Sequence, residues 1–171
     1  MLETKPNLKK IAFNNGLLLA LASILIMVVM YVSGIEKSIL MNIISFAITI
    51  AILVNAIKTY KKENGNILSF SQGLKVGMAT VAIASVISAV YMFIHFSYIS
   101  PETIEAAREE AHRQIAENAG LSMEQKEQSI KLSDTFTSPF MFTTIGLIMS
   151  LFFGFIISLI VTAIMRRDNK A

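Results

Sequence analysis

Cysteine is absent from this chain of 171 residues. Its absence excludes disulfides, thiolate metal sites and cysteine nucleophiles, so any exported loop must hold together without covalent cross-links. Charge is also scarce, because Asp, Glu, Lys and Arg make up 16% of the residues, whereas about 25% is usual in a soluble domain. Long uncharged runs and a mean hydropathy of +0.61 predict a membrane protein instead.

The net charge of +3 and the pI near 9.2 would also fit a protein that binds nucleic acid. The basic residues, however, gather at the ends of the apolar runs, where lipid headgroups lie. This placement excludes nucleic acid as a partner and predicts contact with a lipid bilayer.

Apolar runs long enough to span a bilayer, which takes about 20 residues, occur four times. The predicted spans cover about residues 11–33, 38–57, 74–99 and 139–165. The first run follows basic residues, as in a signal peptide, but it exceeds the usual apolar length of about 7–15 residues and no A-x-A-like cleavage site follows. We therefore expect a retained span, and an all-α polytopic fold in which residues 1–171 form a single membrane domain.

The distribution of Lys and Arg predicts the orientation of the spans. One side would hold ten of these residues: Lys5, Lys9, Lys10, Lys58, Lys61, Lys62, Lys75, Arg166, Arg167 and Lys170. The other side would hold five: Lys37, Arg108, Arg113, Lys126 and Lys131. Cytoplasmic loops carry the excess of positive charge, so both termini are predicted to be cytoplasmic and residues 100–134 to be extracytoplasmic.

The insert at residues 100–134 is predicted to be an acidic helix–turn–helix. Pro101 suits a first helical turn, Gly120 suits a helix C-terminus, and Ser122 with Gln125 forms a capping-box pattern. The first helix carries a narrow apolar stripe: Ile104, Ala107, Ala111, Ile115 and Ala119. Either the insert is a solvated spacer or it docks a partner. The candidate docking residues are Glu105, Glu109, Glu110, Ala111 and Ile115.

Two histidines are candidates for chemistry. Glu109-x-x-His112 has the spacing of di-iron helix bundles, but those sites need a second copy and two further glutamates, so a solvated helix face is favoured and no metal or cofactor is predicted. His95 is the one ionisable residue deep within an apolar run, and intramembrane ionisable residues are functional candidates. Its surroundings of Tyr91, Phe93, Phe96 and Tyr98 favour an interfacial hydrogen-bonding role.

Small residues recur at helical spacing along the predicted spans, where they allow close approach between membrane helices. The predicted packing residues are Gly16, Gly73, Gly77, Ala84, Ser88, Gly146, Ser150, Gly154 and Ser158. Polar groups also occur within the second span, at Asn42, Ser45 and Thr49. The stripes predict packing within a four-helix bundle, although one of them could face another subunit.

Several short motifs occur together in this chain: Phe70-x-x-Gly73-x-Lys75-x-Gly77, Pro101-Glu102, Gly120-x-Ser122-x-Glu124, Pro139, Gly154 and Arg166-Arg167. In order and spacing they resemble the bacterial membrane proteins grouped as domain of unknown function 4199, over nearly the whole chain. The resemblance implies four transmembrane helices with a long extracytoplasmic helical insert, in a bacterial inner membrane. It transfers no catalytic or binding residues.

Paired carboxylates, a Ser–His arrangement at a shared depth and a metal set are all missing from the sequence, so we do not expect an enzyme. The leading hypothesis is an accessory or scaffolding subunit that acts through helix contacts and its acidic insert, together with a protein partner or further copies of itself. The alternative is a small transporter or channel, in which an oligomer would enclose a pore lined by Asn42, Ser45 and Thr49.

Overall fold

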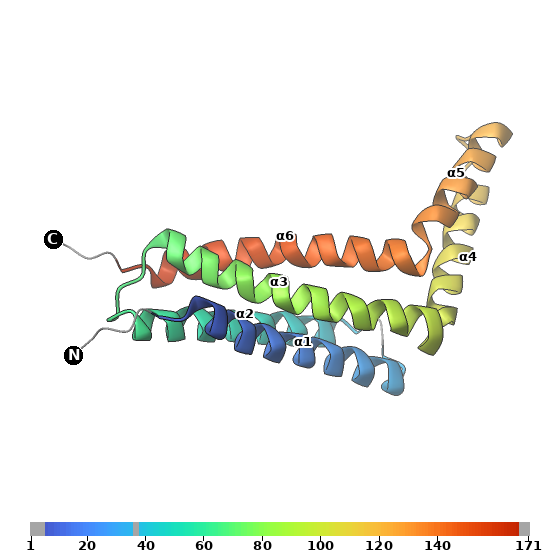
Figure 1. Cartoon of the computed structure of the whole chain (residues 1–171). Coiled ribbons are helices and arrows are strands. Elements are labelled where there is room, and N and C mark those ends of the chain that lie inside the picture. Colours follow the sequence, from blue (N-terminus) through green and yellow to red (C-terminus); the bar gives the residue numbers. More distant parts are fainter. Residues whose placement is uncertain (1–5, 36–37, 168–171) are drawn as a thin grey trace. The chain divides into compact units, whose positions relative to one another are not determined.

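The computed structural model describes residues 6–35 and 38–167, and the regular elements of these residues are helices (Figure 1). In chain order they are α1 (Leu8–Ser33), α2 (Ile39–Glu63), α3 (Phe70–Ile94), the π-helix η1 (His95–Ile99), α4 (Pro101–Glu117), α5 (Met123–Phe136) and α6 (Pro139–Met165). Lys5, Lys37 and Lys170, which entered the charge count, lie outside the described residues.

The helices α1, α2, α3 with η1, and α6 are each long and apolar enough to cross a membrane. This confirms the prediction of an all-α chain with four membrane-span-like helices. The chain forms two compact units, and their boundaries fall within α3 and α6. We call Met1–Ser88 with Met149–Ala171 the four-helix unit and Ala89–Ile148 the hairpin unit.

The long helices begin and end at residues with clear local reasons. Asn7 accepts a hydrogen bond from the backbone N–H of Lys10 at the start of α1, and Ser38 does the same for Met41 at the start of α2. Gly34 ends α1 in the left-handed conformation, with φ of 65°, which a glycine adopts without steric cost. The chain can therefore reverse between α1 and α2 within a few residues.

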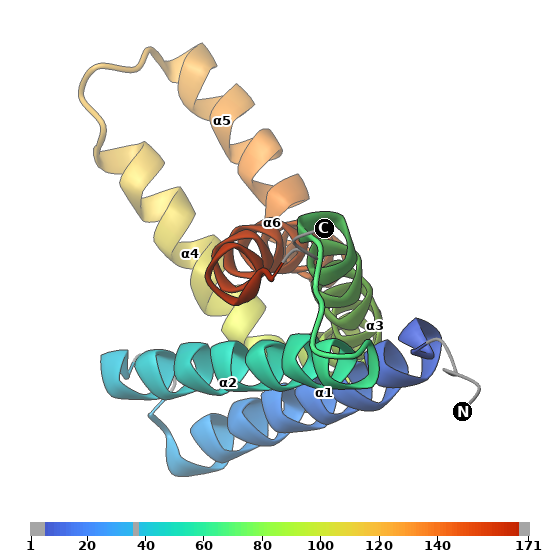
Figure 2. The same ribbon diagram turned by 90° about the vertical axis from the view of Figure 1, so that its left-hand side faces the viewer.

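The four-helix unit has an apolar core that draws on α1, α2, α3 and α6; Figure 2 views these helices from the end at which α6 stops. Leu53 and Ile57 of α2, Val76 of α3 and Leu68, which precedes α3, are fully buried in it. Two contacts fasten the end of α6. Lys61 Nζ donates to the carbonyl of Met165 at 2.7 Å, and Leu68 exchanges two backbone hydrogen bonds with Arg167.

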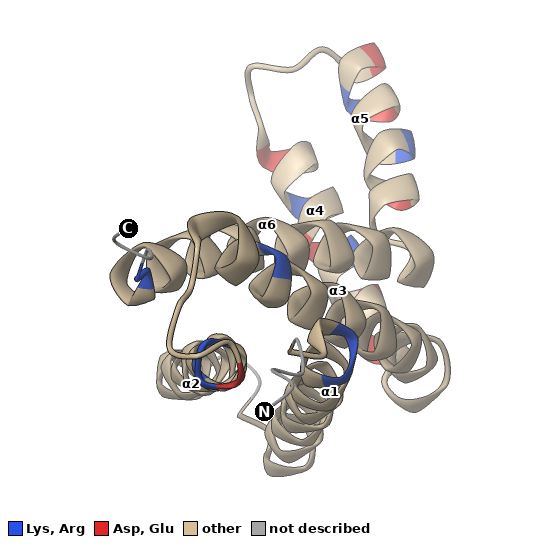
Figure 3. Ribbon diagram, turned by 60° about the vertical axis from the view of Figure 1, so that its left-hand side comes forward, with Lys and Arg blue, Asp and Glu red and all other residues tan. Residues whose placement is uncertain are grey.

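Within residues 6–35 and 38–167, the charged side chains of the four-helix unit lie at the end where α1 and α3 begin and α2 and α6 end, which we call the basic end (Figure 3). Its described cations are Lys9, Lys10, Lys58, Lys61, Lys62, Lys75, Arg166 and Arg167. Glu63 is the one acidic residue of this unit within the described ranges. The bodies of the four helices are therefore uncharged, as a hydrocarbon environment requires.

The hairpin unit pairs α4 with α5 and packs α4 against η1. The predicted capping box is confirmed, because Ser122 accepts from the N–H of Gln125 and the Gln125 side chain accepts from the N–H of Ser122. The predicted role of Gly120 is wrong. Asn118 caps α4 in an extended conformation, and its side chain accepts a hydrogen bond from the Gly120 N–H, so the helix ends at Glu117 without a left-handed glycine.

Candidate functional site

An antiparallel ladder joins α3 to α6 within the four-helix unit. The contacting pairs are Gly73 with Thr162, Gly77 with Ser158, Val81 with Gly154 and Ser85 with Ser150. Each step advances four residues on α3 and recedes four on α6. A Cβ atom on Gly77 would lie 2.5 Å from Ser158 Oγ, which is closer than real atoms approach, so this position requires glycine.

Two hydroxyls of the ladder, on Ser158 and Thr162, are buried and make no hydrogen bond within residues 6–35 and 38–167. Each lies against a glycine of α3, at Gly77 and Gly73. Contacts between Cα–H groups and oxygen recur at helix–helix interfaces and supply weak stabilisation there. The ladder is thus a packing surface on which small side chains bring two backbones together.

The other predicted packing residues take different positions. Gly16 brings α1 against α3, because a Cβ there would lie 2.8 Å from the Cβ of Ile83. Ala84 is buried beside Leu19 and Ala20, while Gly146, in the hairpin unit, lies near the flexible end of Met92. Ser88 makes none of these close contacts and instead lines a cleft.

This cleft, which we call the polar cleft, has a volume of ≈ 360 Å³ and is lined by α1, α2, α3 and α6 of the four-helix unit. Its polar lining residues are Ser23, Asn42, Ser45, Thr49, Ser85, Ser88 and Ser150. Aromatic rings of Phe46 and Phe153 also line it. The three polar residues predicted on α2 therefore share one cavity with serines of three other helices.

Hydrogen bonding inside the polar cleft is incomplete. Thr49 donates its hydroxyl to the carbonyl of Ser45 at 2.9 Å, and the hydroxyls of Ser85 and Ser150 lie 2.7 Å apart. The side chains of Asn42, Ser45 and Ser88 make no hydrogen bond within the part of the chain that the structure describes. The cleft thus offers one carboxamide and several hydroxyls, without any charged group, to a polar ligand or side chain.

A second polar contact, between two residues that were not predicted as site residues, joins α1 to α2. Asn55 donates its carboxamide to Asn15 Oδ1 at 2.9 Å, and Asn15 donates in turn to the carbonyl of Ile11. Asn15 is buried. The signal in the sequence was an asparagine close to the basic flank of each of two apolar runs, with Asn15 five residues after Lys10 and Asn55 three residues before Lys58.

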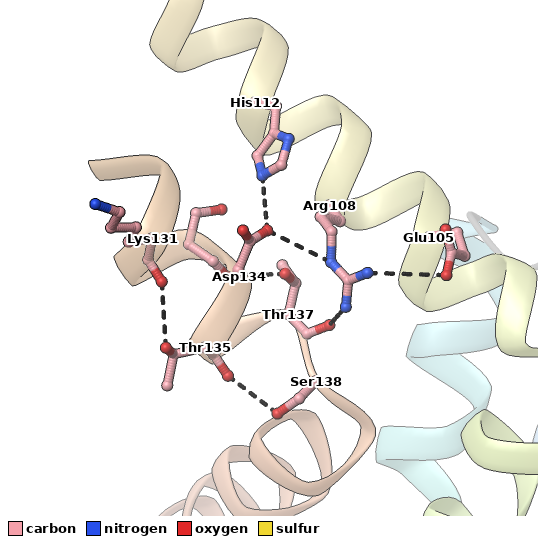
Figure 4. A network of polar contacts seen from close by, with 9 residues as sticks. Glu105, Arg108, His112, Lys131, Asp134, Thr135, Thr137 and Ser138 are labelled. Atoms are coloured by element: carbon pink, nitrogen blue, oxygen red, sulfur yellow. Dashed lines mark hydrogen bonds and ion pairs between the residues drawn. The ribbon is translucent and has the colours of Figure 1, made fainter. Parts of the chain in front are cut away.

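In the hairpin unit, Asp134 of α5 binds two side chains of α4 (Figure 4). His112 Nε2 lies 2.8 Å from its Oδ1, and Arg108 Nε lies 3.6 Å from the same oxygen. Arg108 also donates to the carbonyl of Thr137 at 3.3 Å and lies 3.8 Å from Glu105. This network fastens the two helices together.

His112 therefore pairs with Asp134 across the hairpin unit. No group of three or more metal-ligating side chains occurs within residues 6–35 and 38–167. Of the candidate docking residues, Glu105 pairs with Arg108, Glu110 pairs with Arg113, and Glu109 is exposed. Ala111 and Ile115 are half-buried, as expected for a stripe on α4 that α5 covers only in part.

His95 begins the π-helix that interrupts the regular helix after Ile94. It is 2% exposed, its Nδ1 lies 3.4 Å from the hydroxyl of Tyr91, and its ring packs edge-on against Phe96. Phe96 packs in the same way against Phe142 of α6. The structure thus places His95 among two of the four aromatic residues named from the sequence, while Phe93 and Tyr98 are exposed.

Four apolar helices of spanning length, with charge only at their ends, define a multi-pass membrane protein. The particular family follows from sequence comparison. The chain belongs to the family described as Protein of unknown function (DUF4199), which matches residues 14–167 and confirms the resemblance drawn from the motifs. Comparison with curated proteins and with solved structures found no match.

Proposed function

We propose that this protein is a non-enzymatic membrane subunit that binds a transmembrane helix of another protein in its polar cleft. The observation that carries this proposal is the carboxamide of Asn42, which lines the cleft without a hydrogen bond in the described chain. In hydrocarbon, a polar group without a hydrogen-bonding partner costs free energy. A polar side chain on a partner helix would remove that cost.

The small residues of the cleft support a helix as the bound element. Ser45, Ser88 and Gly154 leave room for a backbone to approach, and membrane helices associate through small residues and interhelical hydrogen bonds. Phe46 and Phe153 add apolar contact area around the polar groups. A cleft with these properties favours binding over catalysis, because it contains no ionisable side chain.

The location that we infer is a bacterial inner membrane with both chain termini in the cytoplasm. The support is the charge of the basic end, because cytoplasmic flanks carry the excess of Lys and Arg. The hairpin between α3 and α6 is then extracytoplasmic. Its exposed carboxylates, including Glu109 and Glu117, would select a basic face on the same partner and raise the association rate at low salt.

The test is photo-cross-linking from within the cleft. A photoreactive residue at Ser45 should yield a discrete adduct with one other membrane protein, and Asn42→Leu in the same chain should weaken that adduct. The control is a photoreactive residue at Leu25, which is 63% exposed and lines none of the cavities described for this unit. Equal adducts from both positions, or adduct formation unaffected by Asn42→Leu, would contradict the proposal.

A second candidate function is a small oligomeric transporter or channel. The observation that favours it is that Asn42, Ser45 and Thr49 line a common cavity, as a pore of several copies would need. Intact-complex mass after mild detergent extraction distinguishes the two functions. A closed homo-oligomer whose reconstituted solute flux falls on Asn42→Leu supports transport, whereas a complex with another protein supports the subunit.

A further inference from the structure

A second groove of the four-helix unit, lying between α2 and α6, has a different character from the polar cleft. Its volume is ≈ 560 Å³, within the range of about 300–1,000 Å³ typical of ligand sites. From α2 it is lined by Phe46, Ile50, Val54 and Lys58. We call it the α2–α6 groove. Apart from Lys58, its lining residues are all apolar.

The α2 residues of the groove follow a stride of four, so they form one row that is inclined to the helix axis. From Phe46 to Lys58 this row rises about 18 Å along the helix axis, at 1.5 Å per residue. One leaflet of a bilayer has a hydrocarbon depth of about 15 Å, half of the roughly 30 Å core. The groove is therefore as deep as one leaflet, and it runs from the middle of the span to the basic end.

Lys58 lies at the charged limit of the groove. Its side chain is exposed, and its ammonium makes no hydrogen bond or ion pair within the described residues. Lys62, Arg166 and Arg167 belong to the same end of the unit. By contrast, the ammonium of Lys61 already donates a hydrogen bond to the carbonyl of Met165.

From this geometry we infer that the α2–α6 groove binds an anionic phospholipid. One acyl chain lies along the row from Phe46 to Val54, and the headgroup phosphate contacts the ammonium of Lys58. The apolar lining of the groove favours a lipid acyl chain, and the unpaired ammonium of Lys58 at the end of the groove favours a negatively charged headgroup. Basic sites between transmembrane helices bind anionic headgroups for the same reason. The inference does not depend on the polar cleft or on its proposed partner.

The test uses the full-length protein purified in mild detergent, with intact mass measured after addition of phosphatidylglycerol or phosphatidylethanolamine. Wild type should retain phosphatidylglycerol preferentially. Lys58→Gln should lower that retention about five-fold, the factor that corresponds to one basic residue near an anionic lipid. Lys62→Gln removes the same charge from the same end without touching the groove, and it should retain the lipid as wild type does.

A bulkier side chain inside the groove tests the inference independently. Val54→Phe should reduce retention of the lipid, whereas Val86→Phe, at a position that is 58% exposed and outside the groove, should not. Inorganic phosphate in excess should fail to displace the lipid, because the acyl chain supplies part of the binding. A thermal melt of each variant identifies any that fails to fold. Lys58 is exposed, so Lys58→Gln decides the result even if Val54→Phe misfolds.

Four results would overturn the inference. Equal losses in Lys58→Gln and Lys62→Gln would mean that the basic end attracts anions without a groove-bound lipid. Equal retention of the two lipids by wild type would remove the selectivity for negative charge. Displacement by inorganic phosphate alone, or a dimer that only Val54→Phe dissociates, would assign the groove to a free anion or to a second copy of the chain.

Discussion

Asn55 of α2 donates its carboxamide to Asn15 of α1 at 2.9 Å, which joins two helices that contain no charged residue along their bodies. Asn15 is buried and also donates to its own helix, at Ile11. The pair therefore satisfies three polar groups at once within an apolar unit. In a membrane, such a contact sets the register between helices as well as their stability.

A double-mutant cycle should measure that contact. Asn15→Ala and Asn55→Ala should each destabilise the protein, because either change leaves the other carboxamide without its partner. The coupling free energy should be about 0.6–1.7 kcal/mol, the range found between helices in membranes. Unfolding in mixed micelles gives the free energies. A coupling free energy indistinguishable from zero would mean that the two side chains do not interact in the folded protein.

The α3–α6 ladder predicts strong effects at its glycines. Gly77→Leu and Gly154→Leu should each lower the free energy of unfolding by about 1–3 kcal/mol or more, since a new side chain would collide with Ser158 or Val81. Thermal stability in detergent is the measurement, and Leu25→Phe at an exposed position is the control. If both glycine variants melt like the control, α3 and α6 do not pack through these residues.

The proposed topology predicts two labelling patterns, and the absence of native cysteine makes single-cysteine probes specific. Glu110→Cys should react with an impermeant maleimide in intact cells, because the hairpin is extracytoplasmic in this topology. Lys62→Cys, at the basic end, should react only after permeabilisation. Both positions are exposed, so burial does not limit the reaction. The opposite pattern would invert the proposed orientation.

Asp134 should control how firmly α4 and α5 hold together. Asp134→Ala removes the partner of His112 and Arg108, so backbone hydrogen exchange in both helices should accelerate. The groups are half-exposed, so the loss should not exceed about 1 kcal/mol. Glu127→Ala is the matched control, because Glu127 pairs with Lys131 on the same helix. Equal acceleration in both variants would show that the interhelical network does not stabilise the hairpin.

Much of the local structure was predictable because it depends on residues close together in the chain. Uncharged runs longer than about 20 residues mark the four apolar helices, since few other environments accept so many apolar side chains in sequence. Pro139 marks the start of α6, and Ser122 with Gln125 marks the start of α5. The predicted role of Gly120 at the end of α4 is wrong, because Asn118 caps the helix and its side chain accepts a hydrogen bond from the Gly120 N–H.

The sequence by itself therefore determined the class of fold, the apolar helices and the family, whereas tertiary structure decided which helix faces meet. On α3 the predicted packing residues continue from Gly77 to Ala84 and Ser88, but the row that meets α6 continues from Gly77 to Val81 and Ser85. Both rows satisfy helical spacing, since 3.6 residues per turn allows a step of three or four. The crossing of α3 with its neighbours selects between the rows, and that selection places the remaining small residues, Ala84 and Ser88, on the polar cleft.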